Sequence, residues 1–143
     1  MLIPDVNILV GAFRRDTPRG QQLAAWLERA LDGAEDVGLP ETVWSGFVRV
    51  ATNPKVFADP SPIIDTLEFL AVIFAPGGAI PIHPGSDHRT IFDRLCRQTN
   101  VRGDRVPDAY LAALAIESGS TFVTMDRGFA LYEGLRWHQP VAL

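Results

Sequence analysis

The stretch from residue 106 to 129, VPDAYLAALAIESGSTFVTMDRGF, constrains the fold more than any other part of the chain. Its proline suits the first turn of a helix, and the Ala- and Leu-rich run that follows favours a helix until a glycine ends it. Residues 121–124, TFVT, predict a short buried strand. A tight turn joins this helix to this strand, so the two run antiparallel. The start of the helix and the end of the strand therefore lie on the same side of the sheet. We therefore expect Asp108 and Asp126 to lie close together.

The rest of the chain alternates between short strands and helices. Further strands are predicted at residues 1–3, 37–39, 79–82 and 136–138. Further helices are predicted at residues 6–13, 19–31, 41–52, 63–74 and 87–97, with a loop at 102–104 and a helical turn at 130–132. Such alternation indicates βαβ units and a parallel sheet. We predict an α/β fold: a three-layer α/β/α sandwich with a mainly parallel sheet of four or five strands, forming one domain over residues 1–143.

The composition is that of a soluble globular protein, with 47% hydrophobic and 21% charged residues. Cys96 stands alone, which excludes an intrachain disulfide and fits a reducing cytosol. The first residues lack a basic start and carry Asp5 inside their apolar run, unlike a signal peptide. No stretch is apolar and long enough to cross a bilayer. We therefore expect a cytoplasmic protein without a membrane partner.

Four acidic residues are predicted at one edge of the sheet. Asp5 ends the first strand and Glu41 follows the second, so both join Asp108 and Asp126. Ionised together, four carboxylates repel one another or shift their pKa values. A hard divalent cation with oxygen ligands removes that repulsion, and Mg²⁺ is the usual choice beside phosphates. One or two such ions can polarise a phosphoryl oxygen and generate a hydroxide.

Taken singly, each acid also has an ordinary structural explanation. Asp5 is a suitable helix cap, and Asp108 and Glu41 suit first turns because the helix dipole favours acids there. Asp126 is a suitable turn residue before an Arg-Gly pair. The shared edge of the sheet is the argument for a common site.

Two polar residues stand beside these acids in the sequence. Asn7, two residues after Asp5, can orient that carboxylate or a water molecule. Thr124, two residues before Asp126, can offer its hydroxyl to the same network. We expect both to support the site.

Three segments, in this order and at this chain length, carry a resemblance to a known family. They are D-x-N at residues 5–7, P-D-A-x-L-A-A-L-A at 107–115 and T-x-D-x-G-F at 124–129. Together they resemble PIN-domain ribonucleases, and most closely the VapC-type toxins of VapBC toxin–antitoxin pairs. Residues 47–50 and 52–54 match the middle of many such toxins. The resemblance implies an Mg²⁺- or Mn²⁺-dependent endoribonuclease that cleaves a structured RNA, such as a tRNA or ribosomal RNA, and so inhibits translation and growth.

The resemblance also implies roles for particular residues. Asp5, Asp108 and Asp126 match the family's catalytic and metal-binding acids directly. Many relatives place a further acid where this chain has Trp44, whereas Glu41 lies three residues earlier, about one helical turn away. The site therefore has either Glu41 as its fourth acid or only three acids. A small cognate antitoxin and a homodimer are implied as well.

The charged residues do not decide whether the chain binds RNA through its arginines. The net charge of −4 argues against a generic nucleic-acid binder, yet Lys55 is the only lysine among 13 Lys and Arg residues. Arginine suits bidentate contacts to phosphate, although codon use in a GC-rich genome explains the same bias. The candidate RNA-binding residues are Arg49, Arg102, Arg105 and Arg127. For the basic cluster ahead of Asp108, a solvated helix face is an equal alternative to an RNA-backbone patch; its members are Arg94, Arg97, Arg102 and Arg105.

Two rival functions fit a chain of this size. A receiver-type phosphoacceptor domain has a similar sheet, but it needs a lysine after a late strand and Lys55 follows a helix instead. A non-catalytic PIN-fold binding module is the second rival. The acids at the strand ends argue against it, and a cleavage assay with metal separates the two.

Overall fold

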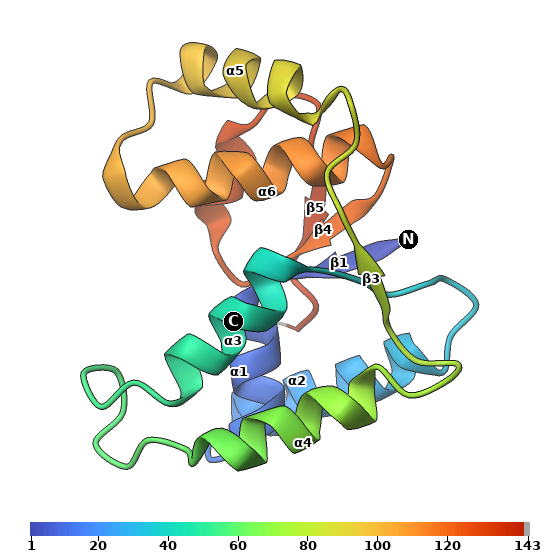
Figure 1. The fold of residues 1–143 in the computed structure, drawn as a ribbon, viewed down its shortest axis with the longest axis vertical. Helices are drawn as coiled ribbons and strands as arrows, with labels where there is room; N and C mark the ends of the chain where they lie inside the picture. Colours follow the sequence, from blue (N-terminus) through green and yellow to red (C-terminus); the bar gives the residue numbers. More distant parts are fainter. Residues whose placement is uncertain (142–143) are drawn as a thin grey trace.

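A computed structural model describes residues 1–141, and within them five short parallel strands lie between two layers of helices (Figure 1). The strands are Leu2–Pro4 (β1), Gly38–Pro40 (β2), Ile80–Ile82 (β3), Thr121–Val123 (β4) and Arg136–His138 (β5). Strands β1, β4 and β5 form one sheet in the order β1-β4-β5, and β2 pairs with β3 in a second. A parallel bridge between Leu2 and Val37 links the two sheets.

Helices cover both faces of this arrangement. They are Val6–Arg14 (α1), Pro18–Leu31 (α2), Glu41–Ala51 (α3), Ile63–Ile73 (α4), His88–Thr99 (α5) and Val106–Glu117 (α6), with 3-10 turns at Gly103–Arg105 (η1) and Arg127–Leu131 (η2). Helices α5 and α6 lie on one side of the strands and α1 to α4 on the other (Figure 1). The predicted three-layer α/β/α sandwich with a parallel sheet is confirmed.

The register of β1 and β4 brings distant parts of the sequence together. Ile3 lies opposite Phe122 and Pro4 opposite Val123. The next amide, that of Asp5, donates to the carbonyl of Val123 at 2.8 Å. The residues that follow the two strands therefore emerge side by side at the carboxyl edge of the sheet, where ligand sites of α/β folds usually lie.

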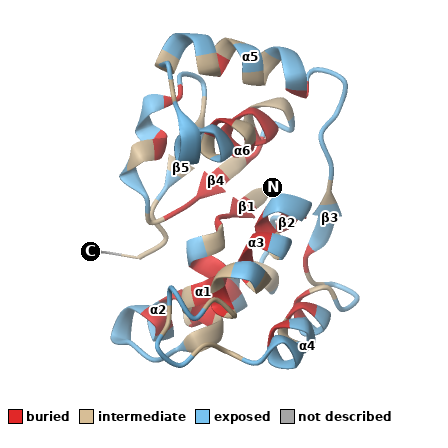
Figure 2. Cartoon of the chain, turned by 60° about the vertical axis from the view of Figure 1, so that its left-hand side comes forward, coloured by how far each residue is buried: buried red, intermediate tan, exposed pale blue. Residues whose placement is uncertain are grey.

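Helix α6 is buried on most of its surface because it lies between β4 and α5 (Figure 2). Four alanines on it are buried, and their small side chains let the neighbouring elements approach closely. Leu111 and Leu114 fill the remaining space, and burying each contributes about 1.5–3 kcal/mol. This packing fixes the start of the helix, which carries Asp108.

Two features of the fold differ in detail from the prediction. The predicted sheet of four or five strands is divided into three and two, since each strand has three residues and the link between the sheets is the bridge at Leu2. The loop expected at residues 102–104 is partly a 3-10 turn that leads directly into α6. Over residues 1–141, none of the helices is both long and apolar enough to cross a membrane.

Candidate active site

Asp5 is the buried centre of the candidate site. It follows β1 and caps α1, with Oδ1 accepting from the Val6 amide at 2.7 Å. Only 8% of the residue is exposed. Burial raises the pKa of Asp5 above its usual range, hydrogen bonds from Thr124 and Val6 oppose the rise, and the charges of Asp108 and Asp126 add to it. The three aspartates therefore lie within electrostatic reach of one another.

Thr124 connects the ends of β1 and β4. Its hydroxyl donates to Oδ2 of Asp5 at 2.6 Å and accepts from the Asp126 amide at 3.0 Å. Asn7 completes the network: its Nδ2 donates to Asp5 Oδ2 at 3.0 Å and to Thr124 Oγ1 at 3.2 Å. Its Oδ1 accepts from the Met125 amide at 3.3 Å. These bonds fix the orientation of the Asp5 carboxylate, and a role of Asn7 and Thr124 in catalysis stays a prediction.

Asp108 and Asp126 are brought together as predicted, with an arginine between them. Nη1 of Arg105 lies 3.2 Å from Oδ2 of Asp108 and 3.5 Å from Oδ2 of Asp126. Asp126 also accepts from the Gly128 amide at 2.7 Å through Oδ1. Burial raises the pKa of Asp108, the bond from Arg105 lowers it, and the charge of Asp126 raises it. The site thus combines three mutually repelling acids with one side-chain cation.

A cavity of about 730 Å³ opens beside Asp5 and Asp108. Its wall also includes Thr42, Arg49, Asp104 and Tyr110. Asp104, in the stretch 102–104 predicted as a loop, is also on this wall. No sequence feature indicates that the Asp104 side chain faces the cavity, because its direction depends on the 3-10 turn that precedes α6.

Glu41 is not brought to the other three acids in this structure. It begins α3 with its side chain 67% exposed, and its Oε1 lies 3.6 Å from Nδ1 of His83. The next residue, Thr42, lines the cavity instead. Successive residues of a helix point about 100° apart, so one position decides which side chain faces the site. Its role as the fourth acid stays a prediction.

The four candidate RNA-binding arginines lie in different settings. Arg49 is exposed and lines the cavity. Arg102 and Arg127 are exposed at the starts of the two 3-10 turns. Arg105 is turned towards the aspartates. Arg49 is therefore the one with the most direct access to a ligand in the cavity, and a contact from any of them to RNA stays a prediction.

The donor set suits a hard divalent ion. Asp5, Asp108 and Asp126 offer carboxylate oxygens, the ligands that Mg²⁺ and Mn²⁺ prefer. Within residues 1–141 no three His, Cys, Asp or Glu side chains stand in the geometry of a metal site. The guanidinium of Arg105 separates two of the three acids, and it marks a place where the protein itself favours positive charge.

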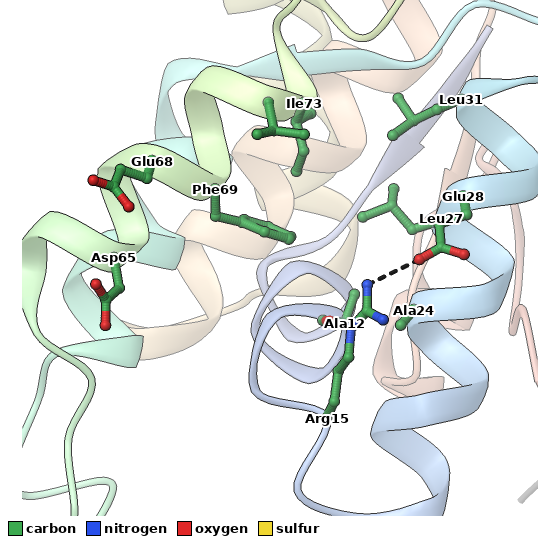
Figure 3. A pocket seen from close by; sticks show the side chains of 11 residues that line it. Ala12, Arg15, Ala24, Leu27, Glu28, Leu31, Asp65, Glu68, Phe69 and Ile73 are labelled. Atoms are coloured by element: carbon green, nitrogen blue, oxygen red, sulfur yellow. Dashed lines mark hydrogen bonds and ion pairs between the residues drawn. The ribbon is translucent and has the colours of Figure 1, made fainter.

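A second concave surface lies away from these acids, between α2 and α4 (Figure 3). This α2–α4 groove has a volume of about 410 Å³. Its apolar wall includes Leu27, Leu31, Phe69, Val72 and Ile73, and its charged residues are Arg15, Glu28, Asp65 and Glu68. Arg15 is paired with Glu28 at 2.9 Å, so the unpaired charges of the groove are acidic.

Comparison with known proteins gives one consistent result. Residues 2–135 match the family model of the PIN domain. Ribonuclease VapC43 of Mycobacterium tuberculosis is 38% identical over 141 residues, which cover 99% of this chain and 96% of that protein. Ribonuclease VapC25 of the same species is 34% identical over 140 residues, covering 98% and 99%.

Solved structures agree on the fold. VapBC2 from Rickettsia felis, bound to a promoter DNA fragment, matches with a TM-score of 0.70 at 15% identity and covers 96% of this chain and 97% of that one. FitAcB from Neisseria gonorrhoeae matches with a TM-score of 0.67 at 18% identity over the full length of both chains.

Proposed function

The chain belongs to the PIN-domain family and, within it, to the VapC ribonucleases, and from that premise we propose that it cleaves structured cellular RNA with a divalent metal ion. The resemblance read from the sequence is confirmed, and the receiver-type alternative is excluded. As a VapC ribonuclease the protein is the toxin of a toxin–antitoxin pair. The proposed substrate is a tRNA or ribosomal RNA whose cleavage inhibits translation and growth, and the proposed compartment is the cytoplasm.

The proposed metal dependence is supported mainly by the buried carboxylate of Asp5, which lies beside two further aspartates. Thr124 and Asn7 hold this carboxylate in one orientation, and Asp108 and Asp126 share its electrostatic field. Mg²⁺ or Mn²⁺, as one or two ions, would be held by these acids and would activate water and neutralise charge on a phosphodiester. A non-catalytic binding module has no need to bury an acid at this cost.

Particular residues of the chain have proposed roles in binding the metal ion and the RNA. Asp5 and Asp108 would hold the ion at the cavity, and Asp126 would hold it from the turn that follows β4. Arg49, on the cavity wall, would bind a phosphate of the RNA, since its guanidinium suits phosphate geometry. Arg102 and Arg127 would bind the strand further away. Glu41 would contribute as the fourth acid after a change of side-chain rotamer.

The α2–α4 groove is the surface we propose for the antitoxin. Phe69 and Ile73 point from α4 towards Leu27 and Leu31 of α2, which leaves an apolar trough (Figure 3). Helix-in-groove binding uses such an apolar trough for affinity, and the acidic residues of the border favour a basic segment. A homodimer is proposed from the family alone, and residues 1–143 are proposed to form a single nuclease domain.

The proposal is tested by mapping RNA 5′ ends in bacterial cells after the protein is induced. We expect new 5′ ends at one or a few positions in tRNA or ribosomal RNA. They should be absent in cells that express Asp126→Asn at the same level, and absent when the antitoxin is co-expressed. The same ends in the variant, or no new ends with the wild type, would contradict the proposal.

A further inference from the structure

We propose that Arg105 is a displaceable counter-ion that lies between Asp108 and Asp126 until a divalent ion takes its place. The inference rests on the proposed function, because it assumes that metal binds at these aspartates. Arg105 then has two states, one paired with both acids and one turned out to solvent. The switch between them sets how tightly the site holds its metal.

The geometry of the paired state is specific. A single nitrogen, Nη1, lies 3.2 Å from Asp108 and 3.5 Å from Asp126, on the Oδ2 atom of each. A cation in this position satisfies the two acids that a bridging ion would also need. A divalent ion held by Asp108 and Asp126 would therefore compete with the guanidinium for these carboxylates.

The rest of the residue is held in place. The Tyr132 hydroxyl donates to the main-chain carbonyl of Arg105 at 3.4 Å, and Tyr132 is itself buried. The guanidinium lies against Gly128: a methyl group on that residue would stand 2.9 Å from Cζ of Arg105 and closer to its terminal nitrogens. A glycine at this point is thus what lets the side chain reach both acids.

The same side chain is free to leave. It is 48% exposed, and Asp126 is 45% exposed, so the outward state needs little loss of hydration. Exposed ion pairs are weak, and a divalent ion held by three carboxylates exceeds them easily. The pairing relieves repulsion between the acids before metal binds, and it lowers the apparent affinity for metal by the work of breaking two weak pairs.

The test is titration with Mn²⁺, followed by electron paramagnetic resonance of the free ion, together with Tm in chelator. Arg105→Leu removes the counter-ion. Gly128→Ala keeps every charge and the amide bonded to Asp126, and displaces the guanidinium by contact alone. Arg97→Leu is the matched control, because it breaks an exposed arginine–aspartate pair within α5, with Asp93, that does not include any of the three aspartates of the site.

We expect Arg105→Leu and Gly128→Ala to bind Mn²⁺ about fivefold more tightly than the wild type, the factor for breaking two exposed pairs. Both should have a lower Tm in chelator and a larger rise of Tm on adding Mn²⁺, and Arg97→Leu should have wild-type Mn²⁺ affinity. If the wild type binds Mn²⁺ and both site variants have unchanged or weaker affinity for Mn²⁺, the proposed counter-ion role of Arg105 is wrong and the metal dependence stands. Absence of Mn²⁺ binding in the wild type and in every variant would overturn the proposed metal dependence with it.

Discussion

Replacing Thr124 by valine removes one hydroxyl from the centre of the site and leaves the shape of the side chain almost unchanged. That hydroxyl donates to Asp5 at 2.6 Å, accepts from the Asp126 amide at 3.0 Å and accepts from Asn7 at 3.2 Å. Thr124 is fully buried, so water cannot replace the lost partner. Valine therefore leaves the Asp126 amide unpaired and Asp5 Oδ2 with the bond from Asn7.

The cost follows from the bonds that are lost. A buried hydrogen bond to a charged group contributes about 1.5–3 kcal/mol, and an unpaired amide adds a desolvation penalty. We expect Thr124→Val to reduce the free energy of unfolding by about 2–3 kcal/mol, which lowers Tm by roughly 6–9 °C for a chain of this length. Thr124→Ser keeps the hydroxyl and is the matched control.

The same change shifts the pH dependence of cleavage. The bond from Thr124 lowers the pKa of Asp5 against the effect of burial, so its loss raises that pKa further. Because metal binding needs the ionised carboxylate, the acidic limb of kcat/KM against pH should move to higher pH in Thr124→Val and stay in place in Thr124→Ser. Thermal unfolding and pH profiles measure the two effects. Wild-type Tm and a wild-type acidic limb in Thr124→Val would refute this account of the network.

Three further predictions concern charge, the fourth acid and the partner. The pKa of Asp5 in the folded chain is raised above 3.8, so the folded chain holds that proton more tightly. The contribution of Asp5 to the free energy of unfolding in chelator should therefore be fully present below pH 3.8 and be lost as pH rises through the folded pKa. Urea unfolding of Asp5→Asn should show a dependence on pH that lacks this contribution. Glu41→Gln should lower Mn²⁺ affinity and the cleavage rate more than Asp104→Asn does, as measured by Mn²⁺ titration and RNA cleavage. A larger effect of Asp104→Asn would identify Asp104 as the fourth acid. Val72→Glu, in the α2–α4 groove, should weaken antitoxin binding by roughly tenfold in calorimetry. Ile64→Glu should not, because Ile64 is also exposed on α4 but lies outside the groove; equal effects would contradict the proposed docking surface.

The sequence was sufficient to predict the aspartate cluster because parallel topology fixes where strands end. Asp5 and Asp126 follow neighbouring parallel strands, and Asp108 starts the helix that leads into one of them. Local patterns therefore determined which edge these residues share. The hydrogen bonds of Thr124 followed from the same register, since Thr124 emerges beside Asp5.

The directions of individual side chains could not be predicted from the sequence. Glu41 has the expected place at the start of α3, but the adjacent Thr42 lines the cavity. The pairing of Pro40 with Ile82 leaves Glu41 beside His83. The sequence predicts Arg105 as a candidate RNA-binding residue. Its contact with Asp108, three residues later, depends on the 3-10 turn that precedes α6. Such details follow from packing between segments that are far apart in sequence.

The most direct test of the central claim is RNA cleavage by the purified protein and its Asp5→Asn variant, each with Mg²⁺, with Mn²⁺ and with EDTA. Asparagine keeps the shape of the side chain and removes its charge, so it isolates the role of the carboxylate. We predict that the wild type cleaves only with metal and that Asp5→Asn is slower by more than about a hundredfold, since even outer partners of metal ligands contribute 10–100-fold. Cleavage by the variant at the wild-type rate, or by the wild type in EDTA, would contradict the claim.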